Sequence, residues 1–326
     1  MIKFNLIFRK YILLWSFIAM LVGYLSGHFN PKRALSLSVL TEPLLFIMIF
    51  IMIIPTELSN ILRLKSYLLP MGISFLLFLL SPFVAYVVSS AIPKSFHYLK
   101  TGIIIVSTAP PEAMLSAWAG FLEADILLTL IIQSYTFIAW IFLLPFGLSL
   151  FFKGAQYFSM NLLIKNLIIL IVIPFAIAIL IKSFLKNRLS KDIRKNIRIT
   201  LSTVSGVIEL FIILISIALN ANIIATNPIL ILWGVLTAGV YYLATFLISV
   251  FSAKVIRIEY EYSIPIIYQN ATKNLPLAMV VALTSFKDQA ILGVAACMLV
   301  QFPISAFFYT IITKIHKNPN YKITQI

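Results

Sequence analysis

The chain has 326 residues, of which 61% are hydrophobic and 11% charged, and its formal net charge at pH 7 is +15. A soluble domain cannot cover that much apolar surface, so the composition excludes the soluble classes and predicts membrane-spanning helices. The basic residues fall in short segments between apolar runs, without the basic and aromatic stripes or zinc-ligand spacing of nucleic-acid binders. We therefore expect membrane lipid, and no nucleic acid, as a partner.

Apolar runs of about 20 residues, the length that crosses the hydrocarbon core, follow one another along the chain. The first run begins after Lys10 and is longer than the hydrophobic region of a signal peptide, so we expect it to be retained as a span. The hydropathy predicts ten spans: 11–29, 37–56, 67–92, 101–121, 126–152, 162–185, 201–223, 228–252, 258–284 and 289–314.

An even number of spans places both termini on the same side of the membrane. Lys and Arg are concentrated in the segments on that side, most densely in the loop 182–198. Because positively charged loops stay in the cytoplasm, we expect a multi-pass protein of the cell membrane with both termini cytoplasmic and residues 315–326 as a cytoplasmic tail. The basic loop is also expected to lie at anionic lipid headgroups.

The two halves of the chain repeat weakly at a shift of about 164 residues, which carries 37–56 onto 201–220 and Pro110 onto Asn274. Because each half has five spans, the second half crosses the membrane in the opposite sense. Inverted repeats of this kind are common in secondary transporters, whose sites lie near the bilayer midplane where broken helices meet. The predicted fold is an all-α membrane protein of ten transmembrane helices arranged as two inverted five-helix repeats.

The fourth and ninth spans are interrupted at corresponding positions. Pro110 and Pro111 remove two amide donors in the fourth span, and the polar run 268–276 interrupts the ninth. Freed backbone groups at this depth are tolerated only where protein buries them or water reaches them. We therefore expect broken, crossing fourth and ninth helices that meet at a polar cavity.

Two charged residues, Glu112 and Lys273, fall at these breaks. An ionisable group inside the membrane is expensive unless it is paired, so both are functional candidates. Two hypotheses stay open: an ion pair that only ties the half-helices together, or direct participation in binding the substrate or coupling ion. Lys273, together with the positive ends of the half-helices, would favour an anionic substrate. Glu209, in the middle of span 201–223, is a weaker candidate.

Other polar residues near the breaks could bind a solute or serve only as contacts between helices. Thr129 and Gln133 are four residues apart and so share one face of the fifth span. The predicted substrate site consists of Pro110, Pro111, Glu112, Ser116, Thr129, Gln133, Gln269, Lys273 and Asn274. A candidate site for one monovalent cation uses Ser116, Thr129, Gln133 and Asn274.

Motifs of intramembrane enzymes are missing from the sequence, which has neither an Asp-x-x-Asp nor a His-Glu-x-x-His arrangement. We therefore expect a protein that is not an enzyme and that has no catalytic residues, cofactor or metal centre. Cys297, the one cysteine, lies in an apolar run and is expected to pack as a small hydrophobic side chain.

Residues 109–114 (Ala-Pro-Pro-Glu-Ala-Met), then Trp118 and Ala124-Asp125, are similar to the Ala-Pro-Cys-Thr-Ala-Met, Trp and Gly-Asp pattern of arsenite efflux permeases. Residues 272–278 (Thr-Lys-Asn-Leu-Pro-Leu-Ala) resemble the Gln-Asn-Ser-Gly-Leu-Ala signature of the bile acid/sodium symporters. The chain thus resembles the superfamily that contains both. The ten-span layout agrees over essentially the whole chain.

The resemblance also implies a division into two parts. Spans 1, 2, 6 and 7, in residues 1–60 and 161–225, would form a panel. The other spans, in residues 66–152 and 228–314, would form a core that moves against the panel. The substrate would then lie between the two parts, at the point where the broken helices cross.

Departures from the family pattern limit what can be transferred. The reactive cysteine of the arsenite permeases falls on Pro111 and their acidic residue in the ninth span on Pro276, so no thiolate is present to hold As(III). In sodium-coupled members a Glu and a Gln of the ninth span help to bind Na⁺, and these positions are Gln269 and Lys273 here. Because an ammonium would repel Na⁺ and could take its place, we infer that at least one family sodium site is absent.

The sequence therefore favours a secondary active transporter that moves a small anionic organic solute by alternating access, with Na⁺ or H⁺ as candidate coupling ions. One alternative is an arsenite or metalloid efflux permease, an arsenical-resistance function, which would need ligands other than thiols. A channel or a sensor is the alternative from another class. Counterflow would separate carrier from channel, because only a carrier exchanges labelled for unlabelled solute.

Overall fold

The computed structural model describes residues 12–40, 43–44, 46–47, 50–51, 67–112, 114–152, 159–185, 191–226, 228–286 and 290–316. These residues are 89% helical, and no sheet is present among them. The all-α class predicted from the sequence is therefore confirmed. Half of the predicted second span, 37–56, lies outside the described residues.

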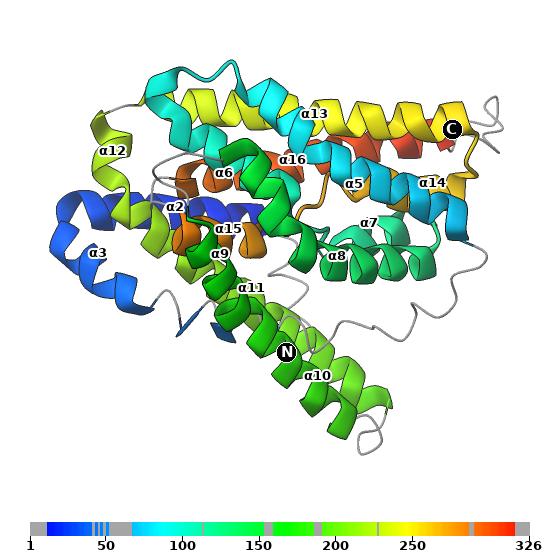
Figure 1. Cartoon of the computed structure of the whole chain (residues 1–326), viewed down its shortest axis with the longest axis horizontal. Coiled ribbons are helices and arrows are strands. Elements are labelled where there is room, and N and C mark those ends of the chain that lie inside the picture. Colours follow the sequence, from blue (N-terminus) through cyan, green and yellow to red (C-terminus); the bar gives the residue numbers. More distant parts are fainter. Residues whose placement is uncertain are drawn as a thin grey trace.

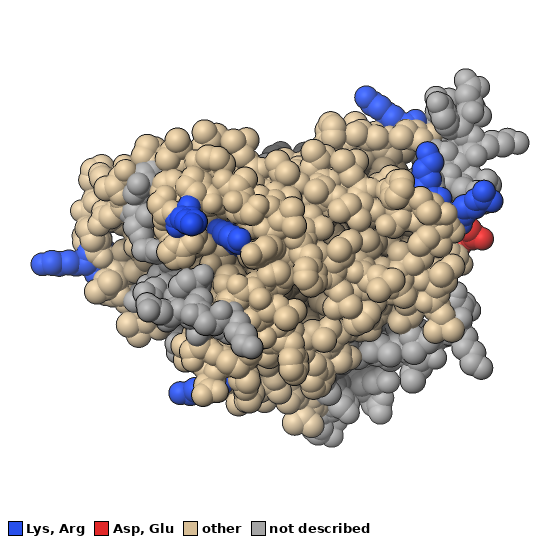
Figure 2. Space-filling view, turned by 45° about the horizontal axis from the view of Figure 1, so that its top comes forward, with Lys and Arg blue, Asp and Glu red and all other residues tan. Residues whose placement is uncertain are grey.

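Four of the described helices are long and apolar enough to cross a membrane. They are α5 (Leu68–Ser89), α8 (Ile126–Phe152), α13 (Ile229–Ile256) and α16 (Ala290–His316). Figure 1 shows α5, α13 and α16 running along the long axis of the molecule. Charged side chains on the face in Figure 2 are few and gather toward the two ends of this axis, with a broad uncharged surface between them. This distribution suits an apolar belt between two polar membrane interfaces.

The remaining helices are shorter or are interrupted. Those in the N-terminal part of each half of the chain are α2 (Ile12–Phe29), α3 (Pro31–Leu37), η1 (Ser38–Leu40), α9 (Met160–Leu167), the π-helical η5 (Ile168–Val172), α10 (Ile173–Leu185), α11 (Lys191–Leu219) and α12 (Ala221–Thr226). Those around the predicted breaks are η4 (Lys94–Phe96), α6 (His97–Thr108), α7 (Met114–Phe121), α14 (Tyr260–Tyr268) and α15 (Leu275–Ser285).

Helix α2 packs along α11 with the two backbones in close contact. A side chain at Gly23 or Gly27 would collide with the backbone of Leu214 or Ala218 on α11. The spacing is that of a Gly-x-x-x-Gly motif, which lets helices approach closely in a membrane, where association depends on packing rather than on the hydrophobic effect. Both helices also contact α16.

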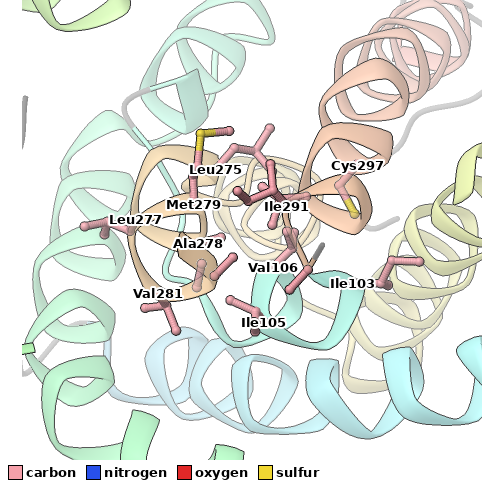
Figure 3. Close-up of a cluster of buried hydrophobic side chains, with 14 of the residues drawn as sticks. Ile103, Ile105, Val106, Leu275, Leu277, Ala278, Met279, Val281, Ile291 and Cys297 are labelled. Carbon is pink, nitrogen blue, oxygen red and sulfur yellow. The ribbon is translucent and has the colours of Figure 1, made fainter. Parts of the chain in front are cut away.

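The centre of the fold is formed by α5, α6, α13, α15 and α16, which pack against one another. Helices α6 and α16 cross at Gly102 and Gly293, where each backbone occupies the space that a side chain on the other would need. Figure 3 shows apolar side chains between α15 and these two helices, with Leu275 and Ala278 of α15 on the side toward Ile291 and Val106. This apolar packing fixes α6, α15 and α16 relative to one another.

The crossing at Gly102 predicts that replacing glycine by alanine destabilises the protein at this position but not at Gly72. We expect Gly102→Ala to lower the melting temperature and the yield of monodisperse protein, because the added methyl group collides with backbone atoms of Ala290 and Gly293. Gly72→Ala on α5 is the matched control, since the space around Gly72 is open. Alanine favours a helix over glycine by about 1 kcal/mol, so the control should be neutral or slightly stabilising. Equal behaviour of the two variants would contradict the crossing.

Candidate functional site

Both predicted breaks are present. Helix α6 ends at Thr108 with Ala109 in an extended conformation, and α7 begins only at Met114. Helix α14 ends at Tyr268, and α15 begins at Leu275. The prolines explain the first break, because neither Pro110 nor Pro111 can donate an amide hydrogen bond to continue the helix.

The two breaks pair with each other as a short antiparallel bridge. The Glu112 amide donates to the Thr272 carbonyl, and the Asn274 amide donates to the Pro110 carbonyl, each at 2.8 Å. Pro111 and Lys273 are the residues opposite each other in this bridge. The sequence repeat predicted that the breaks lie close together, and the bridge confirms it.

Side chains satisfy further backbone groups that the breaks set free. The Glu112 carbonyl accepts a hydrogen bond from Gln133 Nε2 at 2.5 Å, and the Ala271 carbonyl accepts one from Ser305 Oγ at 3.1 Å. Asn274 caps α15, since its Oδ1 accepts from the Leu277 amide at 3.1 Å. Non-helical backbone in a membrane protein requires this kind of internal satisfaction.

Glu112 is half-buried and belongs to a chain of hydrogen-bonded side chains. Its Oε1 accepts from Gln301 Nε2 at 3.3 Å, and Gln301 Oε1 accepts from the Tyr242 hydroxyl at 2.8 Å. Tyr242 and Gln301 are both buried, on α13 and α16. The chain thus ties the carboxylate of the first break to two helices of the core.

Lys273, unlike Glu112, is fully buried and is not hydrogen-bonded through its side chain to the described residues. Its side chain is 0% exposed, and its Nζ has no hydrogen-bond partner among the described residues. The Phe78 ring lies near it, with its centroid 5.2 Å from Nζ, within the range of a cation–π contact. Asn270 Oδ1, three residues away, is also buried and accepts no hydrogen bond from the described residues. No hydrogen bond therefore joins Glu112 directly to Lys273, and the ion-pair hypothesis lacks this contact.

Gln269, on the α5 side of the second break, has both ends of its amide hydrogen-bonded to one residue. Gln269 Oε1 accepts from Ser74 Oγ at 2.6 Å, and its Nε2 donates to the Ser74 carbonyl at 2.9 Å. The Tyr135 hydroxyl donates to the same Ser74 Oγ at 2.7 Å. These contacts join α14 to α5 and α8 next to the crossing.

The predicted site residues fall into three groups. The bridge brings together Pro110, Pro111, Glu112, Gln133, Lys273 and Asn274. Thr129, on α8, is buried and donates its hydroxyl hydrogen to the Asp125 carbonyl of its own helix at 2.7 Å. The side chains of Ser116 and Glu209 lie outside what the structure describes. The monovalent cation site therefore stays a prediction.

Residues that sequence reasoning missed also take part. Gln301 and Ser305 contact the two breaks from α16, and Ser74 holds Gln269. A signal was present for the first two, because they are polar, lie in an apolar span and are four residues apart on one helix face. Tyr242 carries no such signal. Cys297 is fully buried in α16, as expected.

Trp118, which belongs to the sequence pattern around the first break, links the half-helices α7 and α14. Its ring stacks on Tyr268 with the centroids 5.6 Å apart, and Tyr309 of α16 lies 5.7 Å away. Because Trp118 is on α7 and Tyr268 ends α14, this contact holds α7 and α14 side by side.

Membrane-length apolar helices and two broken helices that meet in the interior are the features of a multi-pass membrane transport protein. A model of the Sodium Bile acid symporter family matches residues 42–227, more than half of the chain, and the chain belongs to this family. The matched residues include the first break and end before the second. Comparison with curated proteins finds no match.

The surroundings of Lys273 and Gln269 predict opposite effects of removing their polar groups. We expect Lys273→Met to keep or raise the melting temperature, because it removes an amino group that no described residue hydrogen-bonds and leaves a side chain of similar length. Gln269→Leu should lower stability by about 1–3 kcal/mol, because it removes both buried hydrogen bonds between Gln269 and Ser74. Thermal unfolding of the purified variants measures both effects. A loss for Lys273→Met as large as that for Gln269→Leu would show that Nζ has a partner.

Proposed function

We propose that this protein is a secondary active transporter that carries a small anionic organic solute across the cell membrane by alternating access. The observation that carries the proposal is the buried amino group of Lys273, which has no hydrogen-bond partner among the described residues and lies where two broken helices cross. A buried ammonium without a counterion is strongly unfavourable, and an anionic ligand would compensate it. The N-terminus of α15, which begins two residues later, adds positive potential near the same point.

The proposed topology is the ten-helix inverted repeat. The order of elements supports it, because each half contains a long helix, a broken pair and a second long helix. In the first half these are α5, the α6–α7 pair and α8. In the second half they are α13, the α14–α15 pair and α16. The concentration of Lys and Arg supports cytoplasmic termini.

The proposed moving parts are a panel, residues 1–60 and 161–225, and a core, residues 66–152 and 228–314. The close packing of α2 on α11 supports the panel, and the mutual packing of α5, α6, α13 and α16 supports the core. Alternating access would then consist of movement of the core, with the bridged breaks as part of it, against the panel.

A thiol-based arsenite permease is not favoured by the site. The one cysteine, Cys297, is fully buried among apolar side chains of α16 (Figure 3). Among the described residues, no group of three or more His, Cys, Asp or Glu side chains could hold a metal ion. An amino group enclosed at the crossing suits an anion better than neutral arsenous acid.

Thermal stabilisation by candidate ligands tests the proposal. Purified wild type, Lys273→Met and Lys254→Met would be heated with pyruvate, succinate, methanesulfonate, taurocholate or arsenite, each in Na⁺, K⁺ or at varied pH. Binding to the folded state raises stability by roughly 2.7 kcal/mol at a hundred times the dissociation constant. We expect at least one organic anion to stabilise wild type and Lys254→Met, whose exposed residue lies at the end of α13, but not Lys273→Met.

Two outcomes would contradict the proposal. If an organic anion stabilised Lys273→Met as well as wild type, Lys273 would not be part of the binding site. If arsenite alone stabilised wild type, the protein would belong with the metalloid permeases despite the missing thiolate.

A further inference from the structure

We propose that Lys273 carries the coupling proton, so that the transporter moves one proton together with each anion and needs no Na⁺. This inference rests on the proposed function and adds the identity of the coupling ion. The protonated amine would bind the anion, and both would be released on the other side of the membrane.

The surroundings of Lys273 suit a neutral amine. An ammonium has three donor hydrogens, whereas Lys273 Nζ has no hydrogen-bond partner among the described residues. The Phe78 ring, with its centroid 5.2 Å from Nζ, offers a cation–π contact but no hydrogen-bond acceptor. The side chain is 0% exposed, so bulk solvent does not reach it. A charge in these surroundings is penalised unless an anion accompanies it.

An anion at the crossing reverses the preference of Lys273 for the neutral amine. A negative charge next to Nζ favours the protonated form, and the protonated form favours the anion to the same extent, because linkage between two bound species is reciprocal. Proton and anion therefore bind together and leave together. Nζ takes up the proton through its lone pair on one side of the membrane and releases it on the other, which regenerates the free amine, so no further reactant is needed.

Other titratable groups around the crossing are already engaged. The break itself carries Glu112, whose carboxylate accepts from Gln301. Hydroxyl contacts hold the tyrosines of the neighbouring helices: Tyr135 with Ser74, Tyr241 with Ser81, Tyr242 with Gln301, and Tyr268 with the Ser305 carbonyl.

Other titratable groups of α14 and α16 lie toward the helix ends away from the break: Tyr260, Glu261 and Tyr262 are in the first turn of α14, and Tyr309, Lys314 and His316 are in the second half of α16. Cys297 of α16 is buried beside Tyr242. Helices α7 and α15 contain no titratable side chain, and α5 contains only Tyr86, near its end. Those of α6 (His97, Tyr98, Lys100) lie in its first turns, away from the break. Lys273 is therefore the titratable side chain at the crossing, among the described residues, whose polar atom has no partner.

Charge balance gives the coupling a distinct signature. A monoanion that enters with one proton transfers no net charge, so its transport does not respond to membrane potential. A pH gradient of one unit drives about tenfold accumulation of a monoanion at this stoichiometry. A Na⁺ gradient drives none.

Proteoliposomes containing a trapped pH indicator provide the test. Uptake of labelled pyruvate, succinate, methanesulfonate and taurocholate would be measured together with internal pH, under an inward H⁺ gradient or an inward Na⁺ gradient. Protein-free liposomes correct for weak acids that cross as neutral molecules, and the two sulfonates stay ionised throughout. For a transported monoanion we expect about tenfold accumulation per pH unit, with one proton entering per anion.

Variants assign the proton to Lys273. A guanidinium stays charged, so Lys273→Arg should still exchange labelled for unlabelled anion but should lose accumulation driven by the pH gradient. Lys273→Met should neither exchange nor accumulate. Lys254→Arg, at the exposed end of α13, is the matched control and should behave as wild type.

The possible outcomes distinguish the inference of proton coupling from the proposed transport of anions. Uptake that follows the Na⁺ gradient without proton movement, or full pH-driven accumulation by Lys273→Arg, would overturn the inference and leave the proposed function standing. Failure of wild type to take up any of the four anions would overturn the proposed function and the inference with it. If Lys273→Arg does not fold, the ratio of protons to anions in wild type decides between H⁺ and Na⁺ coupling.

Discussion

Two backbone hydrogen bonds, from Glu112 to Thr272 and from Asn274 to Pro110, join the broken helices at the centre of the protein. Backbone groups cannot remain unpaired in a membrane interior, so each break is stable only because the other supplies its partners. Gln133 and Ser305 complete this pairing from α8 and α16. The glycine contact between α6 and α16 and the apolar packing of α15 then hold the half-helices in register (Figure 3).

The same crossing brings polar and charged residues together in the buried interior of the protein. The bridge sets Lys273 opposite Pro111, whose neighbour Glu112 is the second charge, yet the two charged residues differ in their surroundings. Glu112 is held by Gln301 and through it by Tyr242, whereas Lys273 Nζ has no hydrogen-bond partner in the part of the chain that the structure describes. An arrangement that leaves a titratable group uncompensated costs stability, and such costs are typical of functional sites. This contrast is the physical basis for assigning the anion, and then the proton, to Lys273.

Much of this architecture could be predicted from the sequence. Proline chemistry at Pro110 and Pro111 required the first break, and the weak repeat predicted its proximity to the second. The helix class followed from composition. What the sequence could not provide is the direction of side chains. Glu112 and Lys273, opposite charges at corresponding breaks, suggested a pair, but Gln301 instead bonds to Glu112. Nor could it show the α2–α11 contact, although the spacing of Gly23 and Gly27 was a readable signal.

Disulfide cross-linking across the bridge tests the central claim most directly. Opposite residues of an antiparallel pair whose neighbours make the hydrogen bonds lie about 4.5 Å apart between Cα atoms, which is within reach of a disulfide. In a Cys297→Ser background, the pair Pro111→Cys and Lys273→Cys should form a disulfide rapidly on mild oxidation. The control pair, Pro111→Cys with Ala282→Cys near the far end of α15, should not. Folded protein in which the first pair fails to cross-link would show that the two broken helices do not meet as described.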